Sequence, residues 1–530
     1  MKRLLGKITF ISLAFIGTIM AGCTDELTTG SFVNISDTDV LGNASQLDKV
    51  LTSAYKQLYF NTDKGDRVYA GLPGLQMYVD VGGADIISHT NMGGDQVTAY
   101  QYSNAKTQAD GNASMIWSMC YNVINRTNII LTNIDDASGD EAQKKHIKGQ
   151  ALAMRGIQYF HLIQNYQQTY VIAKDKRGVI LRTSSNDEAS KGFSTVEEVY
   201  NQIVSDLTTA KSLLSDYHPS DLWLINSEIC SGILARVYLV MQNWDGAYNE
   251  AKIVYDQHSQ LMTREQYRSG FDDMISGNYA EVVWAMKYTA DNNLGGGTQF
   301  NFWFNQDASY GEGYADGPIY SFLDFFVDEQ FVKLFEEKED RYQFWKRTNN
   351  VNTEINTKWA FDKYKHYGED GGSVIQSATR PEVCLMRGAE MLLIMAEAAA
   401  QKGNSGEALN LLNRLQVARN ATPTTNAGGD ALLEDIYVER RKELICEGQA
   451  GFYDLVRLQK RLVRIGESTT NPAGHYIWGM QYLNGYNALD PQPIGTLESN
   501  DYRFFCQIPQ MEILNNDAIS EADQNPWSGQ

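Results

Sequence analysis

The sequence predicts a mainly α-helical protein, a tetratricopeptide-like helical-repeat scaffold with long loops and a few short strands. Three observations indicate this fold class. Apolar residues recur at helical spacing through much of the 530-residue chain. Two segments look like copies of one helix-turn-helix unit. Other stretches are rich in Gly, Asn, Asp, Ser and Tyr, a composition that suits surface loops.

The N-terminus has the pattern of a bacterial lipoprotein leader. Three basic residues precede an uncharged run over 8–20, which is too short to span a bilayer as a permanent helix. The small residues Ala21 and Gly22 then precede Cys23, as the narrow cleft of a lipoprotein signal peptidase requires. We therefore expect residues 1–22 to be a signal peptide and Cys23 to carry a covalent lipid. The alternative is an ordinary secretory peptide followed by a chance cysteine.

A short tether and one large domain are expected after the leader. Residues 23–40 are polar and acidic and enriched in Gly, Ser, Thr and Asn, which favours an extended tether. We expect residues 41–530 to form a single domain. Its N-terminal half, 41–290, holds helical repeats, and its C-terminal half, 291–530, holds ligand loops and further repeat helices.

Four amphipathic helices are expected in the first half of the domain. In the first of them, Leu47, Leu51 and Leu58 recur at helical spacing and form one apolar stripe. The last should be capped by Ser194 or Thr195, because acidic residues follow in its first turn, where the helix dipole favours negative charge. The four predicted helices span residues 44–59, 116–134, 142–166 and 195–214.

Two later segments indicate the helical repeat. Ala235 and Ala247 lie twelve residues apart across a turn at 243–246, and Ala396 and Ala408 repeat this separation. Twelve residues separate the two small residues of a tetratricopeptide unit, whose paired helices approach closely. Two unrelated helical hairpins with the same spacing are the alternative.

Composition limits the possible partners and cofactors. The formal charge of −20, with no segregated basic surface, argues against nucleic acid as a partner. Of the six cysteines, the five other than Cys23 show no CxxC spacing, so we expect mostly buried free thiols; a single disulfide remains an alternative. The seven histidines are scattered. We expect no metal site, and no cofactor apart from the lipid on Cys23.

Two segments, 77–111 and 291–317, lack helical periodicity and are predicted to be long surface loops that carry the ligand site. Aromatic rings and amides alternate in the second segment, and sugars pack their CH groups on rings while their hydroxyls need fixed polar partners. The competing interpretation is that 300–304 (FNFWF) is a buried strand. The candidate ligand-binding residues are Trp303, Asn305, Tyr310 and Tyr314 of the second segment and Tyr100 and Tyr102 of the first.

No catalytic residue is predicted. The chain has no GxSxG motif, phosphate loop or HExxH motif, so an enzyme that acts on glycosides is only an alternative. Charged residues recur at helical spacings together with basic residues: Arg387, Glu390 and Glu397 in one segment, and the acids Glu439, Glu443 and Glu447 in another. We interpret them as helix-pairing residues with a structural role.

Several motifs resemble those of the SusD/RagB family of outer-membrane nutrient-binding lipoproteins of Bacteroidetes, in the family's order and nearly from Cys23 to the end. They include the Trp117 and Tyr121 helix, the Ala151 and Arg155 helix, and a terminal Ile-Pro signature. Ala450 departs from the pattern, because the family usually has Arg there, which puts a local salt bridge in doubt. The resembling segments are 113–134, 149–169, 380–400, 436–457 and 504–527.

The resemblance implies a fold, a location and a role. It implies a SusD-like domain that captures a glycan without catalysis and hands it to a SusC-type TonB-dependent transporter. The acidic Asp25-Glu26 pair looks like that group's surface-export signal and implies the outer face of the outer membrane, with Cys23 as the anchor. A third interpretation is an adhesin or scaffold that uses its helical repeats to hold another protein.

Overall fold

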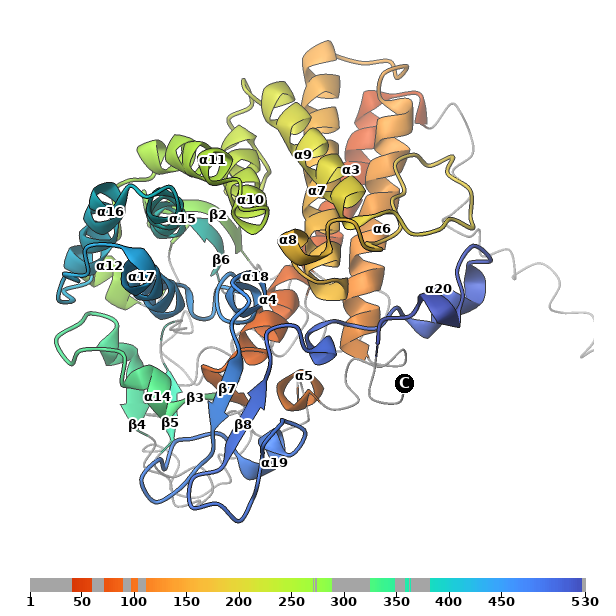
Figure 1. The fold of residues 1–530 in the computed structure, drawn as a ribbon. Coiled ribbons are helices and arrows are strands. Elements are labelled where there is room, and N and C mark those ends of the chain that lie inside the picture. The colour runs from red at the N-terminus through yellow and green to blue at the C-terminus, as the bar shows by residue number, and fades with distance from the viewer. Residues whose placement is uncertain are drawn as a thin grey trace, which may run out of the picture.

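The computed structural model describes residues 41–59, 71–88, 97–102, 111–269, 271, 274–287, 325–347, 358–361, 363 and 382–526. Helices dominate this part of the chain, and the strands are short (Figure 1). The predicted leader and the tether at 23–40, with the lipid-bearing Cys23, lie outside the described residues, and the division of the domain at residue 290 stays a prediction.

The N-terminal helices pack around one long central helix. Helix α7 (Glu141–Tyr166) contacts α3 (Ala44–Tyr59), α6 (Gly111–Asn133) and α9 (Val196–Leu213). All four helices were predicted from apolar spacing. The cap of α9 is Thr195, which forms a capping box with Glu198.

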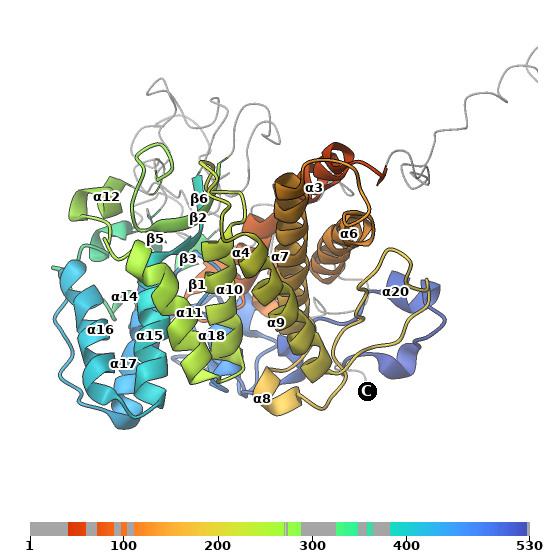
Figure 2. The same cartoon turned by 90° about the horizontal axis from the view of Figure 1, so that it is seen from above.

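The repeat prediction is confirmed. Helices α10 (Ser227–Val240) and α11 (Trp244–Gln257) form one hairpin, and α15 (Gly388–Gln401) and α16 (Ser405–Ala418) form the other. Because α11 packs on α15, the two hairpins stack, and α17 (Gly429–Leu444) continues the row (Figure 2). The paired small residues Ala235, Ala247, Ala396 and Ala408 are all fully buried.

The prediction of a long surface loop over 77–111 is wrong for its described part. Helix α4 (Gly71–Val81), strand β1 (Ile86–Ser88) and helix α5 (Val97–Gln101) occupy the region. Every residue of α4 is buried, including Gln76 and Asp80, so the helix has no exposed face. A helix buried on all sides shows no amphipathic period, which is why the sequence pattern missed it.

Short antiparallel strands connect distant parts of the chain. Strand β2 (Val282–Lys287) pairs with β6 (Glu382–Arg387), and β7 (Leu462–Ile465) pairs with β8 (Ile494–Leu497). A four-stranded sheet runs β1-β3-β5-β4, with β3 at Phe325–Val327, β4 at Trp345–Arg347 and β5 at Trp359–Phe361. The shorter helices are α8 (Tyr170–Ala173), α12 (Arg264–Ser269), α14 (Glu329–Val332), α18 (Phe452–Arg457), α19 (Ile477–Met480) and α20 (Gln510–Asn515).

A buried ionic network joins the C-terminal helices and strands. Arg387, at the end of β6 rather than on a helix as expected, donates to Glu281 at 2.7 Å and to Glu443 at 2.6 Å. It also binds Glu447, while Arg419 contacts both Glu281 and Glu443. The structural interpretation of the motif charges is therefore confirmed.

Two other buried ion pairs connect helices to one another. Glu390 pairs with Arg236, and Glu397 pairs with Arg457. Near the departure at Ala450, Asp454 binds Arg457 at 2.6 Å and Arg440 at 2.9 Å, so this acid is doubly paired although the expected arginine is absent.

The cysteine prediction is also confirmed, because Cys120, Cys230, Cys384, Cys446 and Cys506 are all free and buried. Within the described ranges, no helix combines the length and the apolar character that crossing a bilayer requires.

Candidate functional site

Four of the six predicted ligand residues cannot be placed. Trp303, Asn305, Tyr310 and Tyr314 lie outside the described residues, as does the candidate strand at 300–304. Strand β2 ends at Lys287 and β3 begins at Phe325, so the segment connects strands of two different sheets.

The other two predicted ligand residues, Tyr100 and Tyr102, are not surface rings, which corrects the expectation. They are 0% and 2% exposed. Arg464 reaches from β7 and lies 4.3 Å from the ring centroid of Tyr100 and 5.5 Å from that of Tyr102. The Tyr102 hydroxyl donates to the Gly82 carbonyl. Both rings are therefore used inside the protein and offer no face to a sugar.

Tyr100 belongs to a buried polar group that fixes the chain after α4. Its hydroxyl lies 2.8 Å from His475 Nδ1, and His475 Nε2 lies 3.0 Å from the Ala84 carbonyl, to which only an N–H can donate. Burial, followed by the charge of Arg464, lowers the pKa of His475 well below its usual value, so the ring is neutral. The neutral ring holds Ala84 in place by a hydrogen bond.

Arg464 fixes the same segment from the other side. Its guanidinium donates to the carbonyls of Gly83 at 2.7 Å and Val81 at 3.0 Å. Burial lowers the pKa of Arg464, and the nearby Tyr100 and Tyr102 rings oppose this shift. Val81, Gly83 and Ala84 are thus anchored, and with them the position of the next residue, Asp85.

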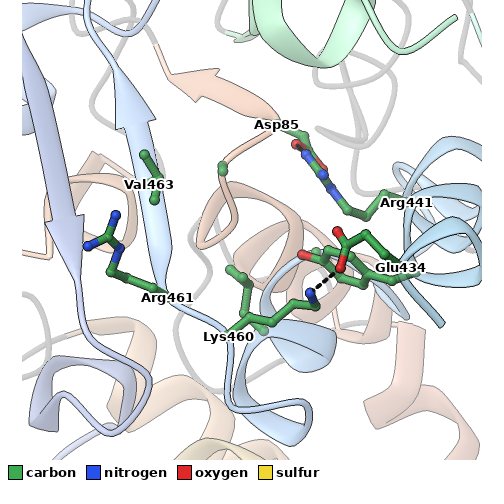
Figure 3. A pocket seen from close by; sticks show the side chains of 10 residues that line it. Asp85, Glu434, Arg441, Lys460, Arg461 and Val463 are labelled. Atoms are coloured by element: carbon green, nitrogen blue, oxygen red, sulfur yellow. Dashed lines mark hydrogen bonds and ion pairs between the residues drawn. The ribbon is translucent and has the colours of Figure 1, made fainter. Parts of the chain in front are cut away.

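A cavity of about 310 Å³ opens beside Asp85 (Figure 3). We call it the α17 pocket. Glu434, Tyr437 and Arg441 recur at i, i+3 and i+7 on α17 and form one wall. The other lining residues are Ala84 and Asp85 after α4, Gly451 and Leu455 at α18, and Lys460, Arg461 and Val463 at β7.

Two ion pairs define the polar part of the α17 pocket. Arg441 Nε donates to Asp85 Oδ2 at 3.1 Å, and a second guanidinium N–H binds the other oxygen. Lys460 Nζ lies 2.5 Å from Glu434 Oε2, the pair joined by a dashed line in Figure 3. Burial alone would lower the pKa of Arg441, but the Asp85 carboxylate holds it above its usual value. Arg441 therefore stays charged at every accessible pH.

The ring of Tyr437 contacts both cations of these pairs. Lys460 Nζ is 4.5 Å from its ring centroid, and the Arg441 guanidinium carbon is 5.4 Å away. Burial raises the pKa of the Tyr437 hydroxyl, so it remains protonated. Because the cations occupy positions against the ring, we expect its hydroxyl to be the group that a ligand contacts.

A buried carboxyl, that of Asp328, lies near Asp85. Asp328 Oδ2 caps α14 by accepting from the backbone N–H of Gln330 at 2.8 Å. Burial raises the pKa of Asp328 to about 7, and the charge of Asp85 adds to the shift. His475 Nε2 is 3.8 Å from the other oxygen of Asp328. In the described part of the chain, no group of three or more His, Cys, Asp or Glu side chains is placed to hold a metal ion.

The sequence did not single out the α17 pocket. Glu434, Tyr437 and Arg441 share a helix face, which their spacing could have shown. However, Asp85 is 356 residues from Arg441 in the chain, and no local pattern links them.

Family models match two large parts of the chain. A model described as starch-binding and associating with the outer membrane matches residues 43–239, and a SusD family model matches residues 335–527. Among relatives, SusD-like protein P38 of Formosa agariphila is 24% identical over 440 residues, which cover 72% of this chain and 79% of that protein. SusD-like protein P2 of the same organism is 25% identical, with coverage of 80% and 83%.

Solved structures agree with these matches. A SusD-like carbohydrate binding protein from Bacteroides vulgatus has a TM-score of 0.74 and 27% identity, with coverage of 92% of this chain and 99% of that one. A SusD superfamily protein from Bacteroides thetaiotaomicron has a TM-score of 0.72 and 26% identity, with coverage of 92% and 100%. The helical-repeat core and both family models therefore indicate the same family, and this chain belongs to the SusD family.

Proposed function

We propose that this protein is a cell-surface lipoprotein that captures a glycan and hands it to a SusC-type TonB-dependent transporter in the outer membrane. The observation that carries the proposal is its likeness, over 92% of the chain, to a SusD-like carbohydrate binding protein. The family description of starch binding and outer-membrane association supports it. Cys23 would carry the lipid anchor, and no catalytic step is proposed.

The proposed primary contacts are Trp303, Tyr310 and Tyr314, with Asn305 as a polar partner. Flat rings accept the CH faces of a sugar, and the side-chain amide can both donate to and accept from its hydroxyls. Tyr100 and Tyr102 are no longer proposed, because their rings are buried.

Glycan binding can be tested with a soluble form, residues 24–530, on an array of plant, algal and host polysaccharides. We expect selective binding to one glycan class. The absence of binding to every glycan by a correctly folded sample would refute the ligand part of the proposal. Incubation of the bound glycan with the protein should release no shorter products, and their release would favour the glycosidase alternative.

Anchoring and partnership need a separate experiment in a Bacteroidetes host. The full chain should be found in the outer membrane, be accessible to protease on intact cells, and copurify with a TonB-dependent transporter. Cys23→Ala should leave the membrane fraction, because the acyl chains supply the membrane affinity. A membrane-bound protein that copurifies with no transporter would favour the adhesin alternative.

A further inference from the structure

We propose that the α17 pocket is a second saccharide site, which takes one neutral sugar unit at the end of a glycan chain. The identification of a sugar as the ligand rests on the proposed function. The site itself rests on the cavity, which is built entirely from described residues and uses none of the predicted ligand residues (Figure 3).

The charges of the α17 pocket favour a neutral ligand. Arg441 is neutralised by Asp85, and Lys460 is neutralised by Glu434. Arg461 is turned away from these pairs in Figure 3, and it pairs with the carboxylate of Glu498 at 3.8 Å. A charged ligand in the pocket would meet a like charge within each ion pair, whereas a hydroxyl can contact both members.

Several polar groups that line the α17 pocket are not used by the ion pairs and can bond to a ligand. Tyr437 lines the pocket although it is only 7% exposed, and its hydroxyl makes no hydrogen bond to a described residue. Arg441 uses Nε and one terminal nitrogen on Asp85, which leaves its other terminal nitrogen, and Glu434 uses only Oε2. The wall thus offers donors and an acceptor together. Sugar hydroxyls, which both donate and accept, match this mixture.

The remaining wall is aliphatic. Val463 is 37% exposed and lines the cavity, as do Leu455 and Ala84. These side chains can receive the CH edge of a sugar ring, while Lys460 already occupies a position against the Tyr437 ring. A volume of about 310 Å³ is at the small end of ligand pockets, which suits one ring rather than a long oligosaccharide.

Binding of methyl glycosides to residues 24–530 tests the proposal, measured by saturation-transfer NMR titration. The probes are the methyl glycosides of glucose, galactose, mannose and xylose, with glucuronate as the anionic and glucosamine as the cationic comparison. We expect at least one neutral glycoside to bind more tightly than both charged sugars. Tighter binding of glucuronate or glucosamine, or no binding of any neutral glycoside, would overturn the inference.

Two matched pairs of variants locate the binding. Val463→Trp fills the cavity and should weaken binding by about tenfold or more, whereas Val417→Trp, at a 64% exposed position on α16, should not. Tyr437→Phe should weaken it about threefold to tenfold, whereas Tyr482→Phe, at a 46% exposed tyrosine outside the pocket, should not. Unchanged affinity in both pocket variants would place the bound sugar elsewhere.

The two proposals can fail separately. If the array shows no glycan binding but the methyl glycoside binds and depends on Val463 and Tyr437, the pocket stands and the proposed function falls. If the array is positive while the pocket variants bind the methyl glycosides normally, the function stands and the pocket inference is wrong.

Discussion

Replacement of Arg387 by Met tests the role of the buried ionic network. The Arg387 side chain is fully buried and donates to three carboxylates, those of Glu281, Glu443 and Glu447. It also donates to the Glu443 carbonyl at 2.8 Å. Removal of one partner from a buried ion pair usually costs about 3–5 kcal/mol, because the remaining charge stays buried without compensation.

The three acids do not lose all their partners. Glu443 keeps Arg419 and Arg341, Glu281 keeps Arg419, and Glu447 keeps Lys363. We therefore expect Arg387→Met to lower the free energy of unfolding by about 3–5 kcal/mol at pH 7, without unfolding the protein outright. Urea unfolding of residues 24–530, followed by circular dichroism, measures this loss.

The loss should also depend on pH. Burial raises the pKa of Glu443 and Glu447, but the surrounding cations outweigh it and hold both below the ordinary value of 4.5. A depressed pKa stabilises the fold above the unfolded pKa, and this stabilisation is lost as pH falls. In Arg387→Met this pH-dependent stabilisation is smaller. The difference in unfolding free energy between wild type and variant should therefore be largest near pH 7 and decrease below pH 4.5.

Two further variants make the result interpretable. Glu447→Gln added to Arg387→Met removes one uncompensated charge and should restore part of the stability. The exposed pair Lys252 and Asp256 is the matched control, and Lys252→Met should cost less than about 1 kcal/mol. A loss below about 1 kcal/mol for Arg387→Met, or no change with pH, would refute the account of the network.

Three other predictions concern a titrating acid, a glycine and a ligand ring. Because the pKa of Asp328 is raised from 3.8 to about 7, its ionisation opposes folding, and wild type should lose stability as pH rises from about 4 to 7. Asp328→Asn lacks this loss, so its stability relative to wild type should improve by roughly 2–3 kcal/mol between pH 5 and pH 8 in urea titrations. Gly448→Ala should cost roughly 2–4 kcal/mol, because φ is +65° and an added Cβ would lie 2.6 Å from the Gln76 Cα. Gly429→Ala, with φ +64° and open space around it, should cost only about 1–2 kcal/mol. Trp303→Ala should weaken glycan binding about tenfold with an unchanged melting temperature, and unchanged affinity would remove Trp303 from the site.

The sequence predicted those parts of the fold that alternate between buried and exposed residues. Helix α3 was predicted with its observed bounds, because its apolar residues recur along a helix that is exposed on the other side. Helix α4 was missed because all of its residues are buried. Tyr100 was misjudged for a related reason: a ring among Asn, Asp and Gly residues has the composition of a binding loop, and its burial under Arg464 depends on a contact 364 residues away.

The structural role of the charged motifs was predictable from spacing, but the α17 pocket was not. Helical spacing correctly indicated that Glu443 pairs with cations; Glu447 does so too, but from the turn after α17, which ends at Leu444. It did not identify the cations, because Arg387 and Arg341 come from a strand and a loop elsewhere in the chain. The pocket likewise requires Asp85 from the N-terminal half to meet α17, a contact that only the folded chain supplies.

Helix α17 links the network to the pocket. At 3.6 residues per turn, Glu443 and Glu439 lie on the side of α17 opposite Glu434, Tyr437 and Arg441. The first side is held by ion pairs with Arg341, Arg387 and Arg419, all fully buried, so the helix cannot rotate without breaking them. The opposite side therefore presents its hydroxyl and ion pairs in one arrangement before a ligand arrives. Such preorganisation reduces the entropy lost on binding, which would favour the saccharide that we propose for this pocket.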